Sequence, residues 1–239
     1  MQKSALVRTR PYAYHLTARA HLARLRSEPR LDSAETICKA AGQESLLQQR
    51  RPVAELVIRD GTPILIRDQQ PLHEGRMDLG EWSFNDLLAD INRRVFFWAG
   101  RVTGPGSHGE AHFERYSEES PIVLRVPMAD LLAEGGAELC RYNSGSPRHS
   151  PMNGKGRPSP RGADTFVSIA EWRHRPSAVV EVTFVGGVRL PHSTEWGRWP
   201  GRALACVGGI VAPRFADRQP TTGSQRRFGN QGHRPSFAV

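Results

Sequence analysis

The sequence predicts one α+β domain over residues 1–190, followed by a poorly ordered basic tail over residues 191–239. Short apolar stretches with the two-residue alternation of β-strands recur throughout the first part. Short helical patterns with capping residues lie between them, and no clear linker divides the chain. Beyond Leu190 the residues are mainly Gly, Pro, Arg and Ser with little apolar periodicity, which is typical of a disordered segment.

Each expected element follows from a local pattern. Tyr12 begins an aromatic strand, and Thr17 stands where it can cap the helix that follows. Asp32 and Glu35 have the spacing of a capping box for a second helix. The run over residues 94–98 is apolar enough to predict a central strand. The expected strands cover residues 12–17, 53–58, 64–66, 94–98, 121–126, 138–142, 164–169 and 177–185, and a further one could lie in 203–211. The expected short helices cover residues 18–25, 32–37, 83–92 and 128–133, and residues 100–120 and 143–160 are expected to be loops.

One carboxylate interrupts the apolar strand over residues 177–185, where Glu181 shares a face with Val179 and Thr183. A buried carboxylate costs free energy unless it is paired or used. The structural interpretation is an edge-strand Glu that faces solvent. The functional interpretation is a catalytic carboxylate held on a rigid element. The strand pattern alone leaves both open.

The charge is strongly positive, at +9 with a pI near 10.3. Such a balance favours anionic partners, namely nucleic acid or a phosphate-bearing ligand, although a GC-rich genome that uses Arg freely gives the same excess. From Val182 onward there are eight Arg against Glu195 and Asp217, a net +6. Most of the excess charge therefore lies in the tail and indicates little about a catalytic cleft.

The cysteines and the apolar runs define the expected compartment. Cys38, Cys140 and Cys206 are widely spaced and form no C-x-x-C pair, so neither a disulfide framework nor a zinc site is indicated. The first residues lack the apolar core of a signal peptide, and no run approaches the length of a membrane span. The expectation is a cytoplasmic protein without membrane contact.

Several polar motifs follow strands without being specific on their own. His15 lies on the first strand, and Arg67 comes directly after the second strand of a hairpin, where its guanidinium could bind phosphate or carboxylate. Residues 143–146 and the Arg161–Gly162 pair could bind an anion through backbone N–H groups. Each of these is more often structural when it stands alone. The common nucleotide-binding, nucleophile-elbow and zinc-protease motifs are missing from the sequence.

Taken together, the motifs resemble an uncharacterised bacterial domain family over about residues 11–190, which is in turn distantly similar to ADP-ribosyltransferases of the DarT type. The motifs are specific as a set. In order, they are Tyr14-His-x-Thr17, Arg67-Asp-Gln-x-Pro-Leu72, Arg94-Val-Phe-Phe-Trp98, Asn143-Ser-Gly-Ser146, Pro160-Arg-Gly-x-Asp-Thr-Phe166 and Ala178-Val-Val-Glu-Val182 with Gly186-Gly-Val188.

The resemblance implies a split antiparallel sheet with short flanking helices that holds NAD in a central cleft. It implies that Glu181 is the catalytic carboxylate and that His15, with Thr17 beside it, binds the ribose hydroxyls. It implies that Arg67 contacts the phosphates and that an aromatic residue stacks on nicotinamide. The candidates for that aromatic residue are Phe96, Phe97 and Trp98, of which Phe97 and Trp98 are the expected NAD-binding residues.

The expected function is therefore mono-ADP-ribosylation of a DNA, RNA or protein acceptor, with an antitoxin as a partner if the protein is toxin-like. Two alternatives remain open at this point. One is an NAD glycohydrolase, and the other is a non-enzymatic module that binds nucleic acid or senses NAD. The resemblance ends after Leu190, where a frame-shifted or truncated gene would give the same change of composition.

Overall fold

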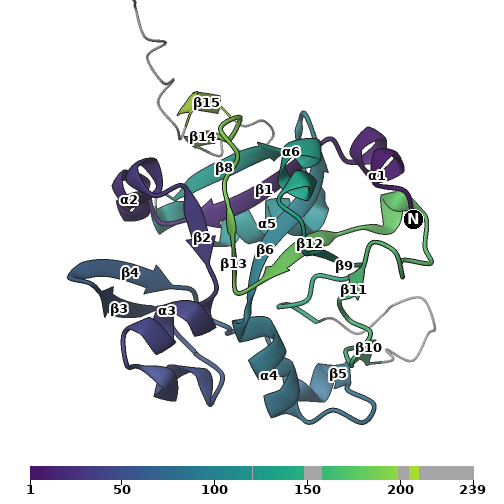
Figure 1. Cartoon of the computed structure of the whole chain (residues 1–239). Coiled ribbons are helices and arrows are strands. Elements are labelled where there is room, and N and C mark those ends of the chain that lie inside the picture. Colours follow the sequence, from purple (N-terminus) through teal and green to yellow (C-terminus); the bar gives the residue numbers. More distant parts are fainter. Residues whose placement is uncertain (120, 148–157, 199–204, 210–239) are drawn as a thin grey trace, which may run out of the picture.

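An antiparallel sheet forms the centre of the molecule (Figure 1). The computed structural model describes residues 1–119, 121–147, 158–198 and 205–209. The sheet has nine strands in the order β11-β9-β12-β6-β1-β8-β14-β15, and β7 pairs with β6. Its strands are β1 (Tyr12–Thr17), β6 (Arg94–Arg101), β7 (Gly104–Pro105), β8 (Ile122–Pro127), β9 (Ala137–Cys140), β11 (Val167–Ser168), β12 (Glu181–Val185), β14 (Glu195–Arg198) and β15 (Ala205–Gly209). The expected α+β class with an antiparallel sheet and short helices is confirmed.

Three two-stranded sheets and short helices surround this sheet. The two-stranded sheets are β2 (Arg30–Asp32) with β13 (Gly187–Arg189), β3 (Glu55–Arg59) with β4 (Thr62–Ile66), and β5 (Met77–Asp78) with β10 (Ser159–Pro160). The α-helices are α1 (Lys3–Thr9), α2 (Leu22–Ser27), α3 (Ala34–Ala40), α4 (Phe84–Asn92), α5 (Ser107–Arg115) and α6 (Met128–Ala133). The capping box of α4 is formed by Ser83 and Asp86, which explains why its beginning could be predicted. Helix α1 was not predicted.

The two central strands separate along their length. β1 pairs with β6 only over Tyr12–Tyr14, although it pairs with β8 as far as Thr17. On its other side, β6 pairs with β12 over the whole stretch from Arg94 to Trp98. The β1–β8 half and the β6–β12 half therefore meet near α6 and spread apart at the opposite end (Figure 1). We call the space between them the fork.

The two faces of the sheet bury different residues. On one face, Phe97 packs edge to face on Phe184, and the core continues through Leu124 to Met128 and Leu131 of α6. On the other face a smaller aromatic cluster contains Tyr14, Trp98, Phe113 and Tyr116. The first face supplies most of the hydrophobic stabilisation, because it buries the larger apolar cluster.

Helix α5 corrects the prediction of a loop over residues 100–120. The sequence pattern misleads because Gly109 lies inside the helix. A Cβ on Gly109 would lie 2.6 Å from Cβ of Pro105 and 3.0 Å from Cγ of Trp98. A glycine that suggests a loop in the sequence therefore permits close packing of α5 on β7 and β6.

Beyond the predicted domain boundary at residue 190, β14 continues the main sheet beside β8. Thr194 is fully buried, and Glu195 forms an ion pair with Arg125. β15 lies within the segment 203–211 for which a strand was considered. The remainder of the predicted tail, residues 199–204 and 210–239, lies outside the described residues.

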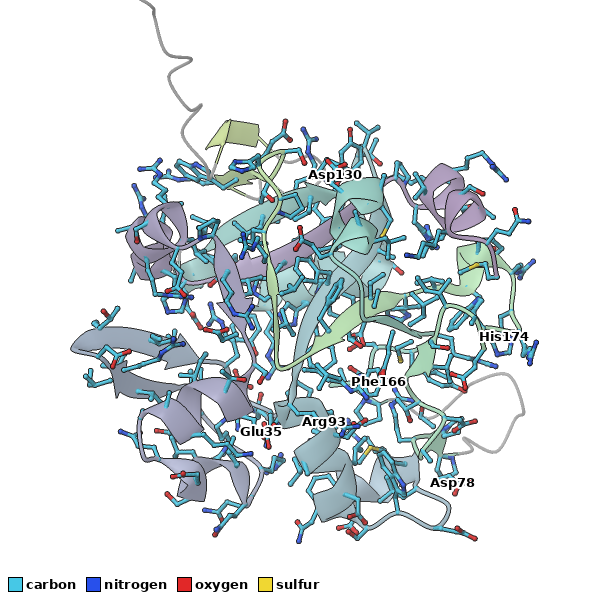
Figure 2. All side chains as sticks on the ribbon, viewed as in Figure 1. Glu35, Asp78, Arg93, Asp130, Phe166 and His174 are labelled. Carbon is cyan, nitrogen blue, oxygen red and sulfur yellow. The ribbon has the colours of Figure 1, made fainter. Side chains whose placement is uncertain are left out.

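Thr17 ends β1 instead of capping a helix, because the 3₁₀ helix Arg19–His21 that follows has Ala18 at its N-cap position. Asp130 of α6 and His174, which precedes β12, are exposed at the surface (Figure 2). Among the helices in the described ranges, none has the length and apolar character required to cross a bilayer.

Candidate functional site

A cavity of about 280 Å³ occupies the fork. Its walls come from β1 and β6, the β3–β4 hairpin and the segment after β4, α5, and the loop over residues 143–146. Five of the six predicted site residues line it, although they come from distant parts of the sequence. These five are His15, Thr17, Arg67, Trp98 and Glu181.

Phe97, which was predicted as an NAD-binding residue, is the exception, because it does not line the cavity. Its side chain is 0% exposed and lies in the main core on the opposite face. The Phe97 ring packs on Phe184 and lies 5.5 Å from the ring of His15, whereas its neighbours Phe96 and Trp98 line the cavity. The aromatic surface that β6 offers to the cavity therefore comes from Phe96 and Trp98.

Glu181 is held at the first position of β12, opposite Trp98 of β6 and Cys140 of β9. Glu181 is 2% exposed, and the backbone N–H of Ser144 donates to both of its carboxylate oxygens, at 3.2 and 3.4 Å. Burial raises the pKa of Glu181 from 4.5 to about 7, although the contacts with Ser144 and the charge of Arg161 act in the opposite direction. At neutral pH, protonated and ionised forms of Glu181 are therefore both populated.

His15 closes the apex of the fork. Its Nδ1 lies 2.8 Å from the carbonyl oxygen of Phe96. A carbonyl only accepts hydrogen bonds, so Nδ1 carries the proton and Nε2 of the neutral ring is an acceptor. Burial lowers the pKa of His15 to about 4, which keeps the ring neutral at physiological pH. The cavity therefore contains an imidazole acceptor suited to a hydroxyl donor.

Thr17 and His21 join β1 to the β3–β4 hairpin. The backbone N–H of Leu65 donates to Nε2 of His21 at 2.9 Å, so the other ring nitrogen, Nδ1, donates to Oγ1 of Thr17 at 2.8 Å. Burial lowers the pKa of His21 to about 4 as well. The Thr17 hydroxyl, which lines the cavity, is thus fixed in place with its own proton left to donate.

Another part of the cavity wall carries Arg67, Asp68 and Tyr116. The hydroxyl of Tyr116 donates to Oδ2 of Asp68 at 2.6 Å, and Cζ of Arg67 lies 4.4 Å from the centre of the Tyr116 ring. Arg67 also forms an ion pair with Glu119. Its Nη2 is buried without a hydrogen-bond partner in the described structure. A buried donor of this kind is costly unless a ligand accepts from it.

A buried polar network holds the Arg67–Gln69 segment against α4. Nη1 of Arg51 donates to Oδ1 of Asn92 at 2.9 Å, and Nε2 of Gln69 donates to the same oxygen at 3.0 Å. Nε of Arg51 donates to the backbone carbonyl of Arg67 at 3.2 Å. The position of Arg67 is therefore set by groups behind the cavity wall.

A scan against family models matches residues 11–193 to DUF7002, which is described as a family of unknown function. The chain belongs to this family. The match agrees with the expectation of an uncharacterised domain family. It includes every residue that lines the cavity and ends one residue before Thr194. No curated protein and no solved structure matches the chain.

Three residues of the family domain near the cavity were not predicted. Tyr116 and His112 escaped because their segment was expected to be a loop, yet both line the cavity from α5 and the residue after it. Arg161 was considered only for its backbone N–H, whereas its side chain is fully buried beside the 143–146 loop. The pattern in the sequence that indicates α5 is the spacing of Phe113 and Tyr116, which lie three residues apart and would share one face of a helix.

Proposed function

We propose that this chain is an NAD-dependent mono-ADP-ribosyltransferase with a nucleic-acid acceptor. The observation that carries the proposal is the position of His15, Thr17, Arg67, Trp98 and Glu181 around one cavity. Their residue types match the needs of NAD, which has ribose hydroxyls, a pyrophosphate and a flat nicotinamide ring. A divided antiparallel sheet around the cavity agrees with the resemblance to DarT-type enzymes.

The chemistry assigns each residue a role. The bond between the ribose C1′ and nicotinamide breaks, and positive charge develops on the ribose ring before the acceptor atom attacks C1′. The ionised Glu181 stabilises that charge or orients the attacking group. Since the fold places its pKa near 7, Glu181 can also take up the proton that the acceptor loses.

The remaining residues bind the substrate. Nε2 of His15 accepts a hydrogen bond from a ribose hydroxyl, and the Thr17 hydroxyl donates beside it. Trp98 and Phe96 give the nicotinamide ring an aromatic surface. Nη2 of Arg67, the buried donor without a partner, binds a pyrophosphate oxygen.

The test is incubation with NAD labelled on its adenylate part, together with panels of single- and double-stranded DNA, RNA and protein. We expect label on nucleic acid and release of free nicotinamide. Label on protein alone would replace the acceptor class. Nicotinamide release without any labelled acceptor would make the chain a glycohydrolase. Salt-sensitive nucleic-acid binding without release of nicotinamide would support a binding module.

His15 offers a matched variant for the binding step. In His15→Asn the amide nitrogen occupies the position of Nδ1 and keeps the hydrogen bond to Phe96, whereas the acceptor at Nε2 is lost. We expect the Kd for NAD to rise roughly tenfold, the effect of one hydrogen bond of about 1–1.5 kcal/mol. The melting temperature should stay close to that of the wild type. Unchanged NAD affinity would remove His15 from the binding site.

A further inference from the structure

Arg161 is the largest fully buried side chain of the described structure and is 2% exposed. None of the ion pairs among the described residues includes it. A buried guanidinium is expensive unless its charge and its N–H groups are compensated. Here the compensation comes from neutral oxygens and from the ring of Tyr142, whose centre lies 4.4 Å from Cζ.

Those oxygens belong to two neighbouring segments. Nη1 donates to Oγ of Ser159 at 2.7 Å and to the carbonyl of Pro160 at 2.8 Å. Nη2 donates to the carbonyl of Asn143 at 2.7 Å, and Nε to the carbonyl of Ser144 at 3.4 Å. The planar guanidinium group therefore holds the backbone at Asn143 and Ser144 against β10.

One peptide unit links Arg161 to Glu181. The carbonyl of Asn143 and the N–H of Ser144 belong to the same peptide, and none of the described peptide bonds is cis. In a trans peptide these two groups point in opposite directions. The carbonyl end faces the positive charge of Arg161, and the N–H end faces both oxygens of Glu181. Both charges therefore orient the peptide dipole in the same sense, and each hydrogen bond strengthens the other.

We propose that Arg161 is a positioning residue for Glu181, acting through the peptide between Asn143 and Ser144. This role rests on the proposed function of Glu181, but the geometry on which it depends can be tested without activity. Arg161 fixes the direction of the N–H that holds the carboxylate, and it favours the ionised form. It does not touch the substrate itself.

The test combines two readouts on wild type, Arg161→Lys and Arg161→Met. The first is the pKa of Glu181, measured by NMR titration of the ¹³C-labelled side-chain carboxyl with assignment from Glu181→Gln. We expect that pKa to rise by roughly one pH unit or more in Arg161→Met. The rise should be smaller in Arg161→Lys, which keeps the positive charge but loses the planar guanidinium group and its set of N–H donors. The matched control is Ser159→Ala, which removes a partner of Nη1 on the far side and should leave the pKa of Glu181 unchanged.

The second readout is nicotinamide release. We expect kcat to fall roughly tenfold or more with little change in KM for NAD, and the acidic limb of the pH profile to move with the pKa of Glu181. If Arg161→Met does not fold, Arg161→Lys gives the same comparison. An unchanged pKa of Glu181 in a folded Arg161 variant would overturn the proposal. A wild type that releases no nicotinamide would contradict the proposed function, while the NMR titration would still decide the link to Arg161.

Discussion

Two buried arginines, Arg94 beside Thr183 of β12 and Arg161 beside the loop that holds Glu181, are compensated in opposite ways. Arg94 of β6 forms ion pairs with Asp90 and Glu138, whereas Arg161 donates to backbone carbonyls and one hydroxyl. Each lies over an aromatic ring, Phe166 under Arg94 at 4.3 Å and Tyr142 under Arg161 at 4.4 Å.

The two arginines differ in whether their charge is neutralised. Arg94 also lines the cavity, but Asp90 and Glu138 neutralise its charge and tie β6 to α4 and β9. Carbonyl oxygens satisfy the N–H groups of Arg161 without cancelling its charge, and that charge acts on Glu181 across one peptide unit. A buried arginine with carboxylate partners therefore indicates stability, whereas one with carbonyl partners beside a cavity indicates control of a charge.

The largest expected effect is on the scaffold side of this comparison. Arg94→Met leaves Asp90 and Glu138 without their buried partner, and we expect the free energy of unfolding to fall by about 3–5 kcal/mol. Urea unfolding measures the loss. Arg93→Met is the control, since Arg93 pairs with the same Asp90 from a half-exposed position and should cost less than about 1 kcal/mol. Equal losses in both variants would mean that Arg94 is not a special scaffold residue.

For Glu181 we expect that the difference in unfolding free energy between wild type and Glu181→Gln changes by about 3 kcal/mol with pH. The folded state raises its pKa from 4.5 to about 7, so it favours the protonated form. The stabilisation of wild type relative to Glu181→Gln is therefore complete below about pH 4.5 and is lost as pH rises through 7. Urea unfolding of both proteins between pH 4.5 and 8 measures the difference.

Asp32 supplies a control whose pKa is shifted in the opposite direction from that of Glu181. Burial alone raises its pKa, but hydrogen bonds from Arg59 and Arg30 hold the pKa below its usual value. The difference between wild type and Asp32→Asn should therefore stay constant from pH 4.5 to 8 and shrink only on further acidification. A pH-independent difference for Glu181→Gln would show that its carboxylate is ionised throughout this range and compensated as the partners of Arg94 are.

The smallest expected effects concern the two rings. Phe166→Leu and Tyr142→Leu each remove a ring that an arginine covers, and each should cost about 0.5–2 kcal/mol in the free energy of unfolding. Phe166 lies between β12 and α4 in the view of Figure 2. Nicotinamide release per folded molecule should fall only in Tyr142→Leu, because that ring supports Arg161. A fall of similar size in Phe166→Leu would remove the distinction between the two arginines.

The fold could be predicted where local patterns are strong. The apolar runs of β1, β6 and β8 and the capping box of α4 indicate their own structure, because burial and hydrogen bonding act within a few residues. Helix α5 and strand β14 could not be found in this way. Gly109 suits α5 only because of its contact with Pro105 and Trp98, and β14 depends on its pairing with β8.

The site was predictable as a set of residue types but not as a geometry. The positions of His15, Arg67 and Glu181 after or within strands indicated polar groups for one cavity. The position of Phe97 in the core could not be predicted, because an unbroken apolar strand does not show which of its residues face the core. Arg161 was beyond sequence reasoning, since its effect passes through the backbone of a loop that is 18 residues away in sequence.

The most direct measurement is nicotinamide release by wild type and Glu181→Gln, with melting temperatures recorded side by side. The substitution keeps the volume of the side chain and removes the charge that supports the developing positive charge on the ribose. The account predicts that release by the variant falls by roughly two orders of magnitude or more, about 3 kcal/mol of transition-state stabilisation, while the melting temperature at neutral pH is unchanged or higher. Unchanged release per folded molecule together with a lower melting temperature would make Glu181 a structural residue and contradict the account.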